Sequence, residues 1–315
     1  KGLIGESGKT NDWDDDETNG GNGGVSSGIY IRNSSGNTIS WNNVSAIVGG
    51  DGGIAIEGMN PGMGGIGAGF FSYNSDNNSF SNNTLFENFG GFGGVFERQM
   101  NDEDIGRGGI GTGIYLLNSD YNEVVDNVLR NNTGGTGGRN IDNYRPSGNG
   151  GTGSGVSVIS SGNNDFLRNN IIDSTGGVGG EAASSCCGAH AGNGGFGVGF
   201  YIVDSKSNNL TSNNVSISRG GSGGDTSQPQ TTTSSVNGGT GGYGVGIYLQ
   251  NSSKNNFVSN TISNLVAGLG SGEWDYDCDD WSDACDVEQL PGPNGTTTAI
   301  WIRDKVSLKN TITST

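Results

Sequence analysis

Two carboxylates, Glu123 and Asp165, are the residues whose type and spacing best suit bond-breaking chemistry. They are 42 residues apart and hold the same place in consecutive copies of a repeated Ser-x-x-Asn-x-Φ motif, where Φ is apolar. If the copies stack as neighbouring strands, the carboxylates lie about 5 Å apart, near the separation in retaining glycosidases. Asp126 and Arg168 follow in the next outward column. We favour a salt-bridged surface patch of little energetic weight, with a glycan-cleaving site as the alternative.

Further acidic residues cluster in two places, in a chain whose net charge is −17. One cluster contains Asp14 and Asp16, and the other contains Asp275, Asp277 and Asp279. The second alternates like the start of a calcium-binding loop, but a further aspartate replaces the glycine of its sharp turn. We therefore favour solvating acid, with calcium as the alternative and no cofactor required. The negative charge also disfavours binding to nucleic acid or anionic membranes.

The four cysteines are Cys186, Cys187, Cys278 and Cys285. Three pairings are open within the chain. A vicinal bridge is strained, so we expect one or two bridges between segments 181–193 and 273–298, with Cys278–Cys285 as the second choice. Disulfides indicate an oxidising compartment, and we expect an extracellular or cell-surface protein. Asn294, in an Asn-x-Thr sequence, is the best candidate for glycosylation.

These side chains belong to a repeat that occurs six times, at intervals of 41–47 residues. Each copy has an apolar strand, a serine and an asparagine, then a second asparagine followed by an apolar residue. The first asparagine column is Asn37, Asn78, Asn122, Asn164, Asn208 and Asn255; the second is Asn42, Asn83, Asn127, Asn169, Asn213 and Asn260. Stacking places identical corners about 4.8 Å apart, so we expect these amides to form hydrogen-bonded ladders.

Glycine occupies regular positions within each copy. A glycine column runs through the first strand, and the period of two around it predicts one buried face. We expect the apolar residues inside and bare glycine outside, with an outward aromatic column of Tyr30, Phe71, Tyr115, Tyr201, Tyr248 and Trp301 that Ser157 interrupts. Packing is favoured over sugar stacking for these rings. A Gly-Gly-x-Gly-Gly segment follows in five copies, and we expect it to cover the glycine face.

Three short strands per copy predict an all-β fold: a right-handed parallel β-helix of about seven long coils with glycine-rich outer segments. The Gly-Ile-Tyr-Leu, Ser-x-x-Asn-x-Φ and Asn-x-Φ patterns resemble the parallel β-helix repeat proteins of the pectin-lyase-like superfamily, especially the NosD-type surface repeats, over about residues 25–312. The resemblance implies the fold and little about activity, because the superfamily includes lyases, hydrolases, adhesins and structural proteins. The coils here are longer than the family's, owing to the glycine segment and a variable loop.

The last copy is half a coil, and the first residues match its missing half. We expect one domain over residues 1–315, with 1–24 completing a neighbouring subunit, 25–296 forming six full coils and 297–315 a terminal half coil. Open β-helix ends pair with whatever fits. Residues Lys1, Gly2, Leu3 and Ile4 would therefore meet Ile312, Thr313 and Thr315 of another copy, head to tail.

The favoured function is a non-enzymatic structural subunit of an extracellular filament or sheath, with copies of itself as partners. A glycan-binding or glycan-cleaving β-helix protein is the alternative, using Glu123 and Asp165 or the aromatic column. No apolar run reaches the roughly 18 residues of a membrane-spanning helix, so no membrane span is expected.

Overall fold

The computed structural model describes residues 20–54, 60–95, 106–140, 146–183, 190–227, 238–271 and 292–313. Several predicted sites lie outside these residues. They are both acidic clusters (Asp14 and Asp16; Asp275, Asp277 and Asp279), the four cysteines, and residues 1–4 and 315 of the predicted polymer contact.

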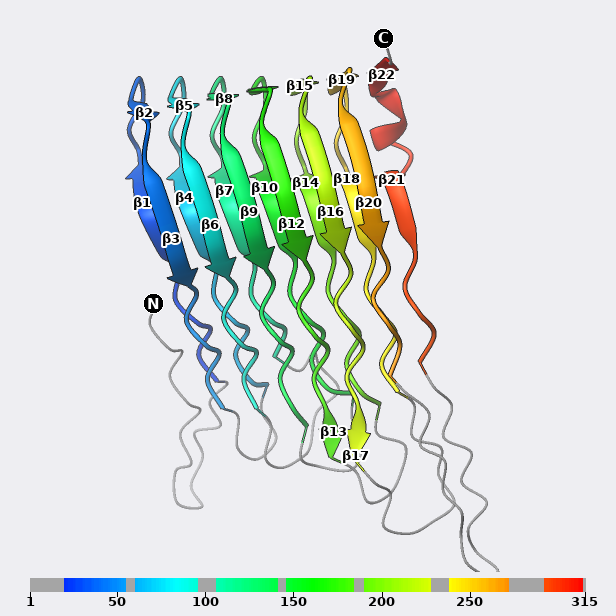
Figure 1. Cartoon of the computed structure of the whole chain (residues 1–315). Helices are drawn as coiled ribbons and strands as arrows, with labels where there is room; N and C mark the ends of the chain where they lie inside the picture. The colour runs from blue at the N-terminus through cyan, green and yellow to red at the C-terminus, as the bar shows by residue number, and fades with distance from the viewer. Residues whose placement is uncertain are drawn as a thin grey trace, which may run out of the picture.

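Each coil contributes strands to three parallel sheets, which form the predicted right-handed parallel β-helix (Figure 1). Sheet A contains β1 (Ser26–Arg32), β4 (Gly67–Tyr73), β7 (Gly111–Leu117), β10 (Gly153–Ile159), β14 (Gly197–Val203), β18 (Gly244–Gln250) and β21 (Thr297–Ile302). Sheet B contains β2 (Thr38–Ser40), β5 (Ser79–Ser81), β8 (Glu123–Val125), β11 (Asp165–Leu167), β15 (Asn209–Thr211), β19 (Asn256–Val258) and β22 (Thr311–Thr313). Sheet C contains β3 (Asn43–Val48), β6 (Thr84–Phe89), β9 (Val128–Thr133), β12 (Asn170–Thr175), β16 (Asn214–Arg219) and β20 (Thr261–Val266).

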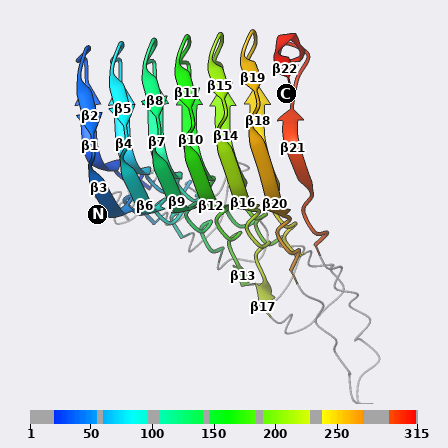
Figure 2. The ribbon, with the colours of Figure 1, turned by 45° about the horizontal axis from the view of Figure 1, so that its top comes forward.

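Corresponding strands of successive coils lie side by side in both Figure 1 and Figure 2. Two short strands, β13 (Ala182–Ala183) and β17 (Thr226–Ser227), pair at the far end of the glycine segments. A 3-10 turn, η1 (Ser307–Lys309), precedes β22. The described part of the chain contains no helix long and apolar enough to cross a membrane.

The apolar core runs along the solenoid axis between the three sheets. In the third coil, Ile114 and Leu116 of β7, Val124 of β8 and Leu129 of β9 are fully buried. Burying one such side chain contributes about 1.5–3 kcal/mol. A narrow core is therefore sufficient here, because every coil adds the same few apolar contacts.

Both asparagine columns form continuous ladders at the corners on either side of sheet B. Asn127 donates from Nδ2 to Asn169 Oδ1 (3.0 Å) and to the Phe80 carbonyl (2.8 Å). Its Oδ1 accepts from the backbone and side-chain amides of Asn83 (2.9 and 3.0 Å). The residue that precedes a ladder asparagine has a positive φ, as at Asn82 (54°), before Asn83, and at Asp126 (55°), before Asn127. The asparagines therefore supply the hydrogen bonds that these tight corners cannot make within the sheets.

The predicted orientation of the glycine column was wrong. A Cβ on Gly113 would lie 3.1 Å from Leu129 Cβ of sheet C, so this glycine faces the interior. The register of sheet A passes from Thr112 to Ile114, which marks a break in the regular pairing at Gly113. Gly113 and Ile114 consequently both face inward, while Thr112 shares the outward face with Tyr115. Glycine is required inside because sheets A and C converge there.

From the sequence we expected the glycine-rich segments to cover the glycine face of the first strands. They instead continue each coil beyond the strands (Figure 1). They form two layers, defined here by residue numbers. The outgoing layer follows sheet C and contains 49–53, 90–94, 134–138, 176–180, 220–224 and 267–271. The returning layer leads into sheet A and contains 20–24, 62–65, 106–109, 148–151, 192–195, 239–242 and 292–295.

Hydrogen bonds in these layers repeat every three residues. In the first coil they run from Gly49 N–H to Phe89 O, Gly50 N–H to Gly24 O, Gly52 N–H to Phe92 O and Gly53 N–H to Gly21 O, at 2.7–2.9 Å. The first glycine of each triplet therefore bonds within its layer, the second bonds to the other layer, and the third residue points outward. Three residues per turn with no bonds inside the segment are the features of a polyproline II helix. A Cβ on Gly91 would lie 1.8 Å from the Gly50 carbonyl oxygen, so close packing of these helices requires glycine.

Candidate functional site

An open groove of about 800 Å³ runs along the solenoid beside sheet A. Its floor is the bare backbone of the returning layer, including Gly64–Gly65, Gly108–Gly109, Gly150–Gly151 and Gly194–Gly195. Its two walls are the side chains at successive third positions, which a polyproline II helix separates by about 9 Å. A groove of this volume lies within the range of small-molecule binding sites.

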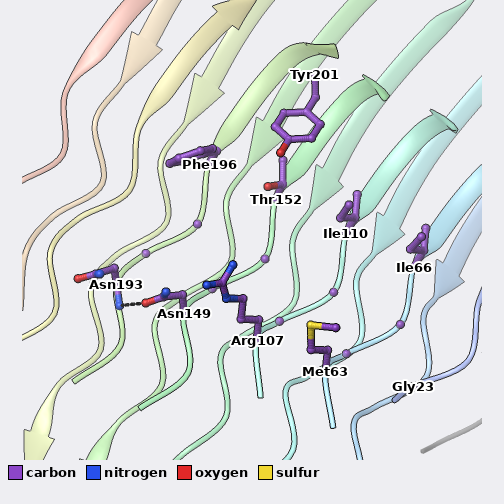
Figure 3. Close-up of a pocket in the computed structure, with 18 of the residues that line it drawn as sticks. Gly23, Met63, Ile66, Arg107, Ile110, Asn149, Thr152, Asn193, Phe196 and Tyr201 are labelled. Atoms are coloured by element: carbon purple, nitrogen blue, oxygen red, sulfur yellow. Dashed lines mark hydrogen bonds between the residues drawn. The ribbon is translucent and has the colours of Figure 1, made fainter. Parts of the chain in front are cut away.

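The two walls differ in chemistry (Figure 3). The polar row contains Asn22, Arg107, Asn149, Asn193 and Thr240, with one apolar member, Met63, between Asn22 and Arg107. The apolar row contains Val25, Ile66, Ile110, Thr152, Phe196 and Tyr243. The Phe196 and Tyr243 rings meet edge to face at 5.4 Å, which fixes one end of the apolar row. The groove therefore offers hydrogen-bonding groups on one side and hydrocarbon surface on the other.

Two arginines line the groove. Among the described residues that line it, Arg107 and Arg303 are charged and none is acidic. Arg303 donates from Nη1 to Tyr248 Oη (3.0 Å) and Gln250 Oε1 (3.1 Å), which holds its guanidinium at the rim.

Tyr201 lies on the strand side of the apolar row, with its hydroxyl end directed toward Thr152 (Figure 3). Burial, and then the neighbouring Tyr248, raise the pKa of Tyr201 to about 12, although Arg303 and Arg107 act in the opposite direction. Burial also raises the pKa of Tyr115 to about 12, with Tyr201 as the second cause. Both hydroxyls thus stay protonated near neutral pH and can donate hydrogen bonds.

The aromatic column faces outward, but most of its rings are covered by one another. Phe71 and Tyr115 stack at 4.9 Å, and Tyr201 and Tyr248 stack at 5.1 Å. Tyr248 is fully buried and Phe71 is only 5% exposed, whereas Tyr30 at the end of the row is 54% exposed. Ring faces that contact other rings cannot stack on a sugar, so the geometry favours the packing role.

Glu123 and Asp165 lie on adjacent strands of sheet B, directly paired in the register of β8 and β11. Both carboxylates are exposed, beside a shallow hollow of about 350 Å³. No basic residue lines that hollow in the part of the chain that the structure describes. The hollow is on a different sheet from the groove, and no described residue lines both.

Asp126 and Arg168 form a bidentate ion pair at the neighbouring corner. Arg168 Nε and Nη2 donate to the two Asp126 carboxylate oxygens, each at 2.8 Å. Hydrogen bonds from the guanidinium hold the pKa of Asp126 below its usual range. Because both side chains are exposed, this pair is expected to contribute little to stability.

The remaining predicted sites are the glycosylation candidate, the calcium ligands and the cysteines. Asn294 is exposed, and its Oδ1 accepts from the Gly270 amide at 2.8 Å. Within the described ranges, no three His, Cys, Asp or Glu side chains gather closely enough to hold a metal ion. The proposed calcium ligands and the cysteines lie outside those ranges, so both remain sequence predictions.

The groove residues were missed in the sequence, although a signal for them exists. Arg107, Asn149, Asn193 and Thr240 each occupy the outward position next to a Gly-Gly pair. A three-residue period places them in one row, whereas the period of two predicted from the sequence describes only the strand residues around the glycine column.

No family model and no curated protein matches this sequence. Among solved structures, the periplasmic alginate epimerase AlgG is 12% identical, with a TM-score of 0.30, over 88% of this chain and 48% of the epimerase. This chain therefore aligns with about half the length of AlgG. A springtail antifreeze protein from Granisotoma rainieri, a bundle of nine polyproline type II helices, is 14% identical with a TM-score of 0.19, covering 67% of this chain and 95% of its own. At these identities and TM-scores, neither similarity carries an argument about activity or ligand.

Proposed function

We propose that this chain is a glycan-binding β-solenoid, which holds a linear sugar chain in the groove of the returning layer. The observation that carries the proposal is the groove's construction: a flat glycine floor between one polar and one apolar row. A sugar ring presents hydroxyl groups at its edges and C–H groups on its faces. Amide, hydroxyl and guanidinium groups on one wall, with hydrocarbon on the other, complement that distribution.

The geometry favours a sugar chain over an extended peptide. Peptides that bind to sheet edges gain affinity from main-chain hydrogen bonds along their length. The floor segments here cross the groove rather than run along it, and their glycine amides already bond to neighbouring segments. A peptide lying in the groove would therefore find no backbone edge to extend.

Blocking the groove tests this proposal. Thr152→Trp places a large ring between Ile110 and Phe196 and should abolish binding to a glycan array. Thr136→Trp is the matched control, because Thr136 occupies the same outward triplet position in the outgoing layer. Equal binding by both variants, with unchanged circular dichroism, would refute the groove as the binding site. Binding of peptides but not glycans would favour the other class of ligand.

Several finer proposals accompany this function. We propose that the protein lies outside the cell, because its four cysteines suit an oxidising compartment. We also propose a relationship to NosD-type repeats, which the asparagine corners support. Glycan cleavage at Glu123 and Asp165 is a further proposal. It is tested by Glu123→Gln, which should abolish any glycan-cleaving activity observed for the wild type.

Head-to-tail assembly is a separate proposal. In the last coil Ile312, which pairs in register with the buried Phe257 of the coil before it, is 55% exposed. Electron microscopy of the purified chain tests it, since only single particles at micromolar concentration would argue against assembly.

A further inference from the structure

A third polar column lies inside the solenoid, near the end of sheet C where each coil enters the outgoing layer. Its members are fully buried and occupy one register position of β6, β9, β12 and β16: Asn88, Asn132, Ser174 and Ser218. The same register position holds Ile47 in β3 and Leu265 in β20. The polar column is therefore flanked by apolar side chains along the solenoid axis.

The asparagines of this column begin a ladder that the serines cannot continue. Asn88 Nδ2 donates to Asn132 Oδ1 at 2.8 Å, as in the corner ladders. The next member is Ser174, which has no carboxamide oxygen to accept from Asn132. Among the described residues, Asn132 Nδ2 and the hydroxyls of Ser174 and Ser218 have no hydrogen-bond partner, and neither does Asn88 Oδ1. Buried polar groups are usually paired with protein or with ordered water.

The backbone does not close in on the smaller serines. A Cβ on Gly153 of sheet A would lie 2.7 Å from the Asn132 carbonyl oxygen, and one on Gly197 would lie 2.5 Å from the Ser174 carbonyl oxygen. Sheets A and C therefore keep nearly the same separation in the asparagine and serine coils. Because serine lacks the carboxamide, each serine coil keeps room for a small polar molecule in this frame. A water molecule occupies about 30 Å³ in the liquid.

We propose that Asn132, Ser174 and Ser218 form an internal water site, in which two ordered water molecules continue the ladder. Stacked positions are about 4.8 Å apart, which is too far for a direct hydrogen bond between short side chains. One water accepts from Asn132 Nδ2 and donates to Ser174 Oγ, and a second bridges the two serine hydroxyls. Water suits the site better than a cation does, because Asn132 presents an N–H donor and a cation requires acceptors.

Two measurements test the water site. A high-resolution crystal structure of the wild type should show a water within about 3.2 Å of both Asn132 Nδ2 and Ser174 Oγ. Oxygen-17 relaxation dispersion of the solvent counts long-lived internal waters, and Ser174→Asn should lower that count by one, because the new carboxamide accepts from Asn132 directly. Ser222→Asn is the matched control: it makes the same change at an exposed residue and should leave the count unchanged.

The stability of two variants separates loss of the water from loss of its hydrogen bonds. Ser174→Val should also displace the water, but it should lower the urea midpoint because it leaves Asn132 Nδ2 without an acceptor. Ser174→Asn should keep or raise that midpoint, since it extends the ladder.

Three results would overturn the proposal. The first is a wild-type crystal structure in which Ser174 and Ser218 bond directly to protein groups and no water lies between them. The second is an equal count of internal waters in the wild type and a folded Ser174→Asn protein. The third is an anomalous signal at the site in rubidium-soaked crystals, which would identify a cation. If Ser174→Asn does not fold, the wild-type crystal structure decides by itself.

Discussion

Replacing one layer glycine by alanine is the most direct test of the glycine architecture. Gly135 lies in the middle of the outgoing layer, where it donates to the Gly109 carbonyl at 2.9 Å. A Cβ there would lie 1.8 Å from the Gly91 carbonyl oxygen, whereas real Cβ atoms essentially never come closer than 3.0 Å. The obstacle is backbone, so a change of side-chain rotamer cannot relieve the clash.

The expected cost follows from what must move. Overpacking in well-packed cores costs about 1–3 kcal/mol, and a backbone obstacle places Gly135→Ala at the upper end. Displacing the Gly91 carbonyl also weakens the bond it accepts from the Gly109 amide (2.8 Å), worth about 1 kcal/mol. We therefore expect Gly135→Ala to lower the free energy of unfolding by about 3–5 kcal/mol.

Urea unfolding followed by circular dichroism measures this loss, and amide hydrogen exchange locates it in the two glycine layers. Thr136→Ala is the control, because its side chain points outward and its replacement should cost about 0.5 kcal/mol or less. Gly113→Ala should fall between the two, since its Cβ would lie 2.8 Å from the Gly155 carbonyl oxygen, a milder backbone clash than the 1.8 Å at Gly135. A Gly135→Ala protein as stable as Thr136→Ala would refute the packing of the layers.

Two further predictions concern the β-helical half of the molecule. Asn127→Ala should lower the free energy of unfolding by about 3–5 kcal/mol, because it removes several ladder bonds and leaves buried amides unpaired. Asn42→Ala, at the partly exposed end of the ladder, should lower it clearly less in the same urea assay. Equal losses in the two variants would contradict the ladder's role. Stability should also fall as pH rises between about 10 and 12, because Tyr115 and Tyr201 have pKa values raised to about 12 and the unfolded chain loses these protons first. The Tyr115→Phe/Tyr201→Phe double variant should lose part of that pH dependence in urea midpoints, and an unchanged dependence would show that other groups cause it.

The asparagine corners could be predicted from the sequence because their chemistry is local and repeated. Asn122 and Asn127 fall at fixed offsets from an apolar strand in every copy, and only stacked coils bring such residues into register. The same logic placed Glu123 beside Asp165, which the register of β8 and β11 shows. Their exposure on a surface was also predicted, whereas their separation from the groove required the structure.

The direction of the glycines could not be obtained from alternation alone. A period of two assigns residues to two faces, and it fails where the pleat is broken. At Gly113 that break puts two consecutive residues inside, which exchanges the predicted faces of every residue before it in β7. Thr112 and its counterparts Ala68 and Val198 therefore lie outside, against the aromatic column.

The glycine layers also explain why the groove side chains can differ from coil to coil. Two of every three residues are fixed as glycine by backbone contacts, but the third projects from the packed layers and meets no such constraint. Rows of these third residues are spaced by the helix itself, at about 9 Å, whatever their side chains. Arg107 can therefore replace an asparagine in the polar row, and Thr152 an apolar residue in the other, without altering the floor. The fold sets the dimensions of the groove, while the side chains that line the groove can vary to suit a ligand.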